Sequence, residues 1–269
     1  MMRISKMTAL SCWLLAFSAN VYCQEESADS PKLITNSQMI GLGPTRVLDT
    51  YLSAEHFSGT GLTYLSHTER TRGKAWTTVL QHEANFSVVK DRADNRKELE
   101  GAYNLYWGKL YTWKWNQLKV QAGGMVNASL GFIYNTGNGN NPAQARAHLN
   151  LMPTGAASYS FRLFGKQMLA RYEVALPLCG VMFSPNYGQS YYEIFSRGNY
   201  DHNVVPTTFV AAPEWRQLLT LDAKLSKKFT LRIGYLGNMQ QSKVNGLRQH
   251  VYTHRFLIGF TRNFTIVTQ

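Results

Sequence analysis

The sequence predicts an all-β protein, an antiparallel transmembrane β-barrel of about ten strands preceded by a cleaved signal peptide. Apolar and aromatic residues alternate with small or polar ones over long stretches, a period of two that belongs to strands. Aromatic residues are 13% of the chain and charged residues only 16%, against about 25% charged in an average soluble domain. Beyond the first 20 residues no apolar run is long enough for a membrane-spanning helix.

The first 23 residues read as a signal peptide. Arg3 and Lys6 give its positive start, residues 8–19 its short apolar stretch, and Val21 and Cys23 fit the small-residue cleavage positions. A lipidated Cys23 is the alternative reading of the same stretch. Either form predicts export.

After the leader, the chain divides into three expected parts. Residues 24–44 are polar and turn-rich, and they predict a periplasmic tail. Residues 45–264 predict the barrel, and residues 265–269 a C-terminal extension. The weakest strands are expected at 45–57 and 60–70, joined by a turn at Ser58-Gly59.

From Trp76 to Phe264 the alternation is regular through eight strands, and it is clearest in the last, residues 250–264. One face is apolar with aromatic residues near its ends, and the other is small, polar or charged. An apolar band on the outside and a polar interior are typical of outer-membrane barrels. Short and long connections alternate, so the strand that leads to Arg70 is expected to run toward the periplasm. A periplasmic N-terminus then requires one more strand before the turn at Ser58-Gly59. These two strands and the eight that follow make about ten.

Five stretches carry a resemblance to a known family. They are residues 47–53, 58–61, 131–151, 183–195 and 241–260. The chain resembles an uncharacterised group of Gram-negative outer-membrane barrels, domain of unknown function 3316, found mainly in Bacteroidetes. The resemblance covers nearly all of the mature chain and implies a secreted precursor and an outer-membrane barrel. It implies no activity, and the residues after Phe264 depart from the usual terminal Phe.

Charged residues on the polar face form the main candidate site. We expect a lumenal network of salt bridges, with a small selective channel as the alternative. Its members are Glu83, Glu100, Lys119, Arg146, Arg162, Arg171, Glu173, Arg216, Asp222, Lys224, Arg232 and Arg255.

The segment 184–206 is the second candidate site because it breaks the alternation and is rich in aromatic residues. On a rigid barrel such a loop is either a binding surface or a cap over the lumen. The residues expected to bind are Tyr187, Tyr191, Tyr192, Glu193, Phe195 and Tyr200.

An outer-membrane lipid or lipid A hydrolase is the enzymatic alternative. His56 and Ser58 have the i, i+2 spacing of a catalytic pair on one strand face, but no third group to orient the imidazole is identifiable. His250 and His254 lie about 13 Å apart on a strand and cannot share one metal ion. No catalytic residue, metal or cofactor is therefore expected.

The mature chain keeps a formal charge of +10, which is +12 less the two basic leader residues. In an exported barrel this surplus favours anionic lipid head groups and lipopolysaccharide phosphates over nucleic acid. The other expected partners are the barrel-assembly machinery and a small-molecule or glycan ligand. A structural, ligand-binding or minor transport role in the cell outer membrane is expected, with a small-solute channel as a further alternative.

Overall fold

The structure is a computed structural model that describes residues 32–72, 75–139, 141–226 and 229–266. The signal peptide expected at residues 1–23 lies outside the described residues, as do residues 24–31 of the expected tail. None of the helices in the described part of the chain has the length and apolar character needed to span a bilayer.

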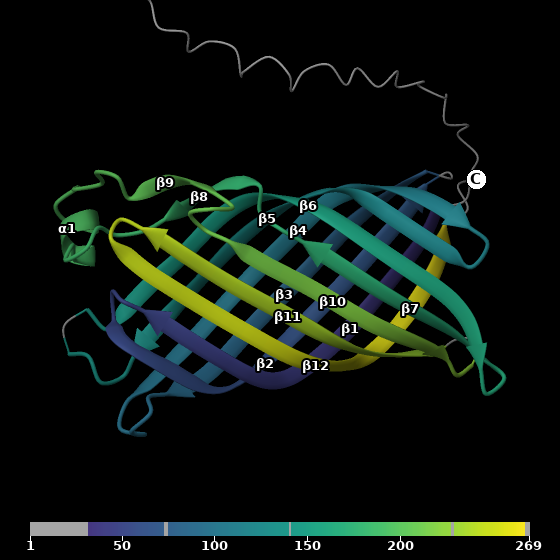
Figure 1. Ribbon diagram of the computed structural model, residues 1–269, viewed down its shortest axis with the longest axis horizontal. Coiled ribbons are helices and arrows are strands. Elements are labelled where there is room, and N and C mark those ends of the chain that lie inside the picture. The colour runs from purple at the N-terminus through teal and green to yellow at the C-terminus, as the bar shows by residue number, and fades with distance from the viewer. Residues whose placement is uncertain (1–31, 73–74, 140, 227–228, 267–269) are drawn as a thin grey trace, which may run out of the picture. The chain divides into compact units, whose positions relative to one another are not determined.

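The described chain is nearly all strand, with one short helix (Figure 1). The strands are β1 (Lys32–Asp49), β2 (Ser53–Arg72), β3 (Trp76–Lys90), β4 (Lys97–Trp115), β5 (Leu118–Asn135), β6 (Ala143–Leu163), β7 (Lys166–Ala175), β8 (Cys179–Phe183), β9 (Val204–Thr208), β10 (Glu214–Lys224), β11 (Thr230–Val244) and β12 (Leu247–Ile266). The helix is α1 (Tyr191–Phe195).

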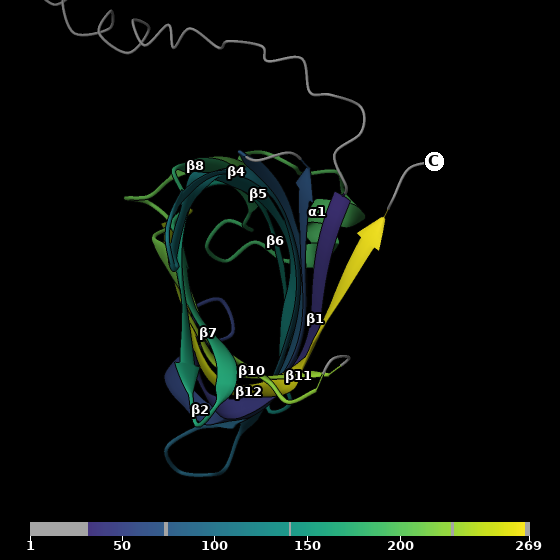
Figure 2. The same cartoon turned by 90° about the vertical axis from the view of Figure 1, so that its right-hand side faces the viewer.

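Ten of the strands in the described ranges close into one antiparallel barrel. Around the ring the order is β1-β2-β3-β4-β5-β6-β7-β10-β11-β12, and β12 pairs with β1 to complete it. The ring is seen end-on in Figure 2. β8 and β9 form a small hairpin that continues along the edge of β6 beyond the end of β7. The prediction of a closed antiparallel barrel of about ten strands is confirmed.

The two ends of the barrel differ in their connections. At the end where β1 begins and β12 ends, here called the terminal end, the turns are short, such as the one at Asn116 and Gln117. At the opposite end, the loop end, residues 91–96, 136–142 and 176–213 form longer connections, and α1 lies in the longest. The short turns also need left-handed backbone, which Asn116 and Gly165 adopt.

The first strand of the barrel begins earlier than expected. Residues 32–44 were expected in a tail, yet they form most of β1 and pair with both β2 and β12. The turn expected at Ser58-Gly59 lies instead at residues 50–52, where Tyr51 N donates to Asp49 Oδ1 at 3.0 Å. Gly59 lies inside β2, where it allows β2 to approach β3 closely. A Cβ at this position would collide with the backbone of β3 at Val88.

The C-terminal strands are also longer than expected. The loop expected at 242–248 is a two-residue turn at Asn245 and Gly246, whose positive φ angles allow a tight hairpin. β12 continues to Ile266, so only residues 267–269 of the expected extension fall outside the described chain.

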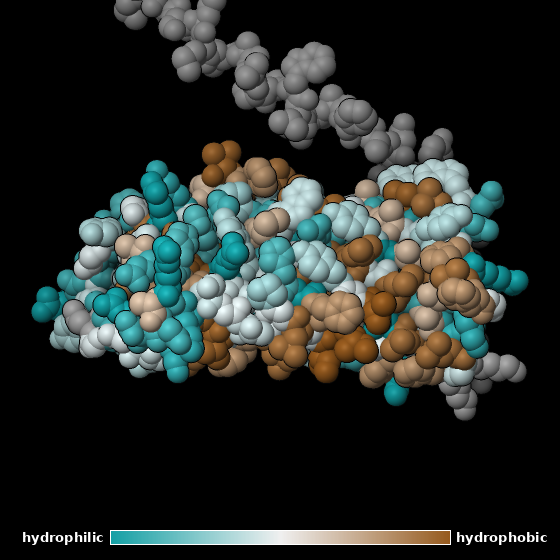
Figure 3. Space-filling model, turned by 60° about the horizontal axis from the view of Figure 1, so that its bottom comes forward, coloured by the Kyte–Doolittle hydropathy of each residue, from teal (hydrophilic) through white to brown (hydrophobic). Residues whose placement is uncertain are grey.

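The outer face of the barrel is apolar over a broad band. Large exposed hydrophobic side chains such as Leu42, Trp107, Leu130 and Phe256 point outward from the sheet. Figure 3 shows brown side chains gathered over the middle and the terminal end, while the loop end is hydrophilic. Because closure leaves no sheet edge unpaired, this outer face is compatible with an apolar surrounding.

The interior is less uniformly polar than the sequence suggested. Three buried apolar clusters point inward between the charged residues. One is Met39, Leu65, Leu218, Leu236 and Leu257, drawn from β10 round to β2. Another is Val79, Tyr106, Leu110, Met125, Met152 and Ala175, drawn from β3 to β7. The third, Val47, Leu52, Phe57, Val89, Ile133 and Val251, fills the loop end.

Candidate functional site

A buried arginine spans the middle of the lumen. Arg216 on β10 lies 3.0 Å from Glu83 on β3, and four strands separate β10 from β3 in either direction round the ring. The two side chains therefore span the barrel between opposite walls. Arg216 also donates to Gln81 at 2.7 Å and lies 4.3 Å from the centre of the Tyr106 ring. This arrangement satisfies a buried guanidinium that is only 1% exposed.

A second bridge lies closer to the terminal end. Arg171 on β7 contacts Glu69 on β2 at 2.9 Å, and these two strands are again separated by four strands on each side. Arg171 also contacts Glu173 at 2.8 Å, and Lys119 Nζ donates to Glu69 at 3.2 Å. These contacts form the floor of a cavity.

The cavity above this floor, here called the basic chamber, has a volume of about 1180 Å³. Its lining residues lie at the terminal ends of the strands, for example Gln117 beside the β4–β5 turn and Gln167 beside the β6–β7 turn. The chamber therefore belongs to the terminal half of the lumen. The cavities at the loop end are much smaller, about 40 and 10 Å³, the former with room for a few water molecules.

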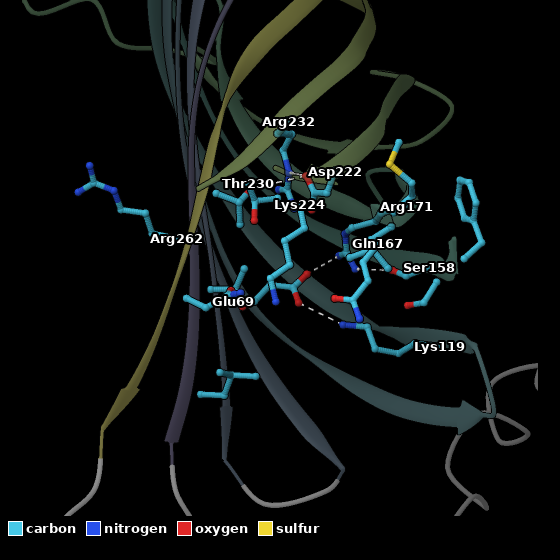
Figure 4. Close-up of a pocket in the computed structure, with 18 of the residues that line it drawn as sticks. Glu69, Lys119, Ser158, Gln167, Arg171, Asp222, Lys224, Thr230, Arg232 and Arg262 are labelled. Atoms are coloured by element: carbon cyan, nitrogen blue, oxygen red, sulfur yellow. Dashed lines mark hydrogen bonds and ion pairs between the residues drawn. The ribbon is translucent and has the colours of Figure 1, made fainter. Parts of the chain in front are cut away.

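Five basic side chains line the chamber, against two acidic ones. The basic residues are Lys119, Arg162, Arg171, Lys224 and Arg232, and the acidic ones are Glu69 and Asp222. Figure 4 shows Lys119, Arg171 and Lys224 gathered around Glu69, with Arg232 beside Asp222. Arg262 belongs to the rim, but its guanidinium points away and lies 5.0 Å from the centre of the Phe260 ring.

A buried imidazole also lines the chamber. His67 is 3% exposed, and neither of its ring nitrogens has a hydrogen-bond partner among the described residues. Its Nε2 lies 3.7 Å from Glu69 Oε1, beyond hydrogen-bonding distance. Nε of Arg171 is likewise unpartnered within the described chain. Unsatisfied buried polar groups are uncommon in folded proteins, so each of these atoms needs an explanation.

All twelve charged residues expected in the lumen lie on the inward face of their strands. Nine are buried, whereas Lys119, Arg162 and Lys224 keep exposure inside the basic chamber. The expected set divides into local groups along the lumen. Arg146 contacts Glu100 at 3.4 Å near the loop end, and Arg232 pairs with Asp222 near the terminal end.

Arg255 is a different case because no acidic side chain pairs with it in the described residues. Its guanidinium donates to the carbonyl oxygens of Gly43 at 2.9 Å and Pro44 at 2.7 Å, and to Thr45 Oγ1 at 2.7 Å. A Cβ at Gly61 would collide with Arg255. Inward glycines therefore make room for this arginine.

Four further residues, which were not expected from the sequence, complete these groups. His67 and Glu69 lie two and four residues after Leu65 and so continue the inward face of β2. Gln81 on β3 and Tyr106 on β4 also face inward, and both contact Arg216. These residues alternate in step with the charged, inward-facing residues of the same strands, and that pattern is the signal that could have identified them.

The loop expected to bind ligands is folded against the mouth at the loop end. Tyr191 packs edge-to-face on Tyr51 at 5.7 Å, donates to Gln144 Oε1 at 2.9 Å and accepts from the Ala145 backbone N–H. Burial raises the pKa of the Tyr191 hydroxyl above its ordinary value. Asn245, in the β11–β12 turn, donates to Ser184 O at 3.0 Å.

Of the remaining loop residues that were expected to bind a ligand, one caps α1 and the others are exposed. Glu193 belongs to a capping box with Ser190, whose backbone N–H and hydroxyl donate to its carboxylate and hold the pKa of Glu193 below its usual value. The residues left exposed are Tyr187, Tyr192, Phe195 and Tyr200.

His56 and Ser58, the pair considered for lipid hydrolysis, lie on the outer face of β2. Both side chains are exposed, and within the described residues neither has a hydrogen bond. The described chain also contains no group of three or more His, Cys, Asp or Glu residues placed to hold a metal ion.

Solved structures with a similar arrangement are outer-membrane barrels. The translocator domain of the autotransporter NalP from Neisseria meningitidis is 10% identical with a TM-score of 0.40, and the match covers 89% of this chain and 91% of that one. The outer membrane protease OmpT from Escherichia coli is 6% identical with a TM-score of 0.40, covering 88% and 98%. Neisserial surface protein A is 8% identical with a TM-score of 0.34, covering 86% and 97%.

No curated protein sequence matches the chain. A family match, in contrast, extends over residues 7–269, nearly the whole length. The chain belongs to the family described as Protein of unknown function (DUF3316).

Proposed function

We propose that this chain is an outer-membrane β-barrel of a Gram-negative bacterium that is closed to passive diffusion and binds a ligand in its basic chamber. The observation that carries the proposal is the pair of ionic bridges between opposite walls. Arg216 with Glu83 and Arg171 with Glu69 each join strands that lie across the lumen from one another. Solute passing from end to end would have to separate buried, paired charges.

The outer surface supports placement in a membrane. Exposed aliphatic and aromatic side chains are distributed over the strands, and the tryptophans of the described chain all point outward. The strands run to 15 residues or more in most of the ring, whereas an apolar band about 25 Å tall needs only about 10 tilted residues. The additional length supports a hydrophilic end that projects from the membrane (Figure 3).

The turn lengths support one orientation. Barrels of this class have short periplasmic turns and longer extracellular loops. The terminal end would then face the periplasm and the loop end the cell exterior. In this orientation the basic chamber opens toward the periplasm, and the loop end with α1 faces outward.

Binding fits the chamber better than conduction does. A channel needs a continuous path of water, but the described residues of the loop end line two small cavities and form an apolar cluster that includes Phe57 and Ile133. The chamber instead offers a polar space that is closed on one side by its floor. A concave site with a few convergent charged groups is the usual form of a ligand site.

Single-channel recording in planar lipid bilayers tests closure. The mature chain is reconstituted in vesicles, its insertion is verified by flotation and by resistance of the strands to protease, and the same vesicles are fused to the bilayer. We expect no steady openings at voltages that a general porin tolerates in the same apparatus. Steady openings of uniform conductance would contradict the proposal and support the channel alternative.

A further inference from the structure

We propose that the basic chamber binds a phosphate group, carried either by a soluble phosphate compound or by a lipid head group. The inference rests on the proposed binding role and names the chemistry of the ligand. It follows from the charges in the chamber, from polar atoms left unpartnered at its floor and from the placement of the basic residues on five adjacent strands.

The first step concerns charges that remain uncompensated. Glu69 is shared by Arg171 and Lys119, and Asp222 is engaged by Arg232. Arg162 and Lys224 have no acidic partner among the described residues, although both line the same chamber. Confining basic groups within low-dielectric walls concentrates an attractive field for anions.

The second step concerns the floor. His67 and Arg171 are each at least nine-tenths buried, and both carry ring or guanidinium nitrogens without a partner in the described chain. Both residues line the chamber. Unsatisfied polar groups cost free energy. These atoms are covered by neighbouring protein atoms, so an acceptor in the chamber would reach them after a small shift of the two side chains.

The third step concerns the shape of the anion. The five basic side chains come from five strands, β5, β6, β7, β10 and β11, which are consecutive in the ring, so together they line one half of the chamber wall. A planar carboxylate is matched by a single two-pronged donor. A phosphate group carries about two negative charges and has three acceptor oxygens, so it can engage donors from several strands at once.

Titration calorimetry with the full mature chain in a neutral detergent provides the test. The probes are sodium pyrophosphate, short-chain dihexanoyl phosphatidic acid and sodium malonate, each at low ionic strength because exposed charges are screened by salt. We expect both phosphate probes to bind more tightly than malonate. Binding of phosphatidic acid without pyrophosphate would identify a lipid head group, and binding of both would show that the phosphate group itself suffices.

Two variants make the test specific for the chamber. Arg162→Gln and Lys224→Gln should each weaken phosphate binding about tenfold, the loss expected for one charge-assisted contact. Arg70→Gln is the matched control, since Arg70 lies next to Glu69 in sequence but points outward and is exposed. Its phosphate affinity should equal that of the wild type.

Three results would overturn the phosphate assignment. They are no binding of either phosphate probe, equal affinity for malonate, and wild-type affinity in the Arg162→Gln/Lys224→Gln double variant with an unchanged circular dichroism spectrum. Because the measurement is made in detergent, it does not depend on closure. A conducting barrel that still bound pyrophosphate would disprove the proposed closure alone.

Discussion

Buried charges in this protein are compensated locally, and the compensation differs from residue to residue. Arg216 has two carboxylates, an amide and an aromatic ring around it. Arg255 is held by backbone carbonyls and hydroxyl groups, which it reaches because glycine at position 61 leaves the space free. Removing one partner from such a group leaves an uncompensated charge, which costs more than the pair contributes.

Replacing Arg216 with Met should therefore destabilise the barrel strongly. Among the described residues, Glu83 would then keep the amide of Asn85, at 2.9 Å, as its one side-chain hydrogen-bond partner. Breaking a buried pair in this way costs about 3–5 kcal/mol. The double variant Arg216→Met/Glu83→Gln removes the orphaned charge and should recover most of the loss.

Denaturant unfolding of the two variants in lipid vesicles, compared with the wild type, measures the difference. Equal instability of the single and double variants would show that the packing of Arg216 on Tyr106, and not its charge, is what matters. Glu173 remains paired with Arg171 in both variants, so it serves as a common background.

At the scale of single elements, β1 and α1 show how neighbours decide local structure. β1 carries Pro44 and several polar residues, and these make its sequence resemble a linker. Its backbone nevertheless finds partners on both sides, because β2 and β12 each supply an unpaired edge. Pairing on two sides satisfies far more backbone groups than an isolated segment could.

α1 is too short to be stable alone, since isolated helices need about 12–15 residues. Its capping box and the contact between Tyr191 and Tyr51 hold it in place. Tyr51 also donates to Gln189 O at 3.0 Å, which ties the loop to the β1–β2 turn. The loop that carries α1 is therefore fixed by its contacts with the barrel.

The capping box should make α1 sensitive to acid. The pKa of Glu193 in the folded protein is below its ordinary value near 4.5. The ionised carboxylate therefore stabilises α1 fully at pH values above 4.5. This stabilisation is lost as the pH falls through the lowered folded pKa. Hydrogen exchange of the α1 amides, corrected for intrinsic rates, should show falling protection over this acidic range.

Glu193→Gln is the matched control for this effect, since glutamine keeps the capping geometry without titrating in that range. Protection in this variant should stay constant with pH. Ser190→Ala removes the N-cap acceptor and should lower local stability by about 1 kcal/mol at every pH. Identical pH dependence in the wild type and Glu193→Gln would rule out the capping box as the cause.

At the scale of the whole barrel, the placement of charged and large hydrophobic residues is the reverse of that in soluble proteins. Charged residues are buried in the lumen, and large hydrophobic residues cover the outer face. Trp76, Trp107, Trp113, Trp115 and Trp215 are all exposed on that face. These residues make the membrane placement testable by fluorescence.

Brominated phospholipids should quench most of the tryptophan emission of the reconstituted chain, because the quencher occupies the surroundings of the outer face. Water-soluble acrylamide should quench it only weakly. Vesicles of the same lipid without bromine provide the reference. Strong acrylamide quenching with little effect of bromine would contradict a lipid-facing surface.

The alternation of residues was sufficient to predict the barrel, its closing strand and the inward side of its charged residues. An alternating strand assigns each side chain to one of two faces, so face membership can be read directly from sequence. The tail boundary at 24–44 could not be read in this way, because Pro44 and polar residues weaken the pattern in β1.

Which inward residues meet was decided by tertiary structure alone. Arg216 and Glu83 are 133 positions apart in the chain and come together only because the ring closes with their strands on opposite walls. The register and tilt of ten strands set the height of each inward residue, and neither is encoded in the alternation. The sequence by itself therefore determined a barrel with charges inside, while closure of the ring decided that those charges meet across the middle of the lumen and that a basic chamber lies at one end.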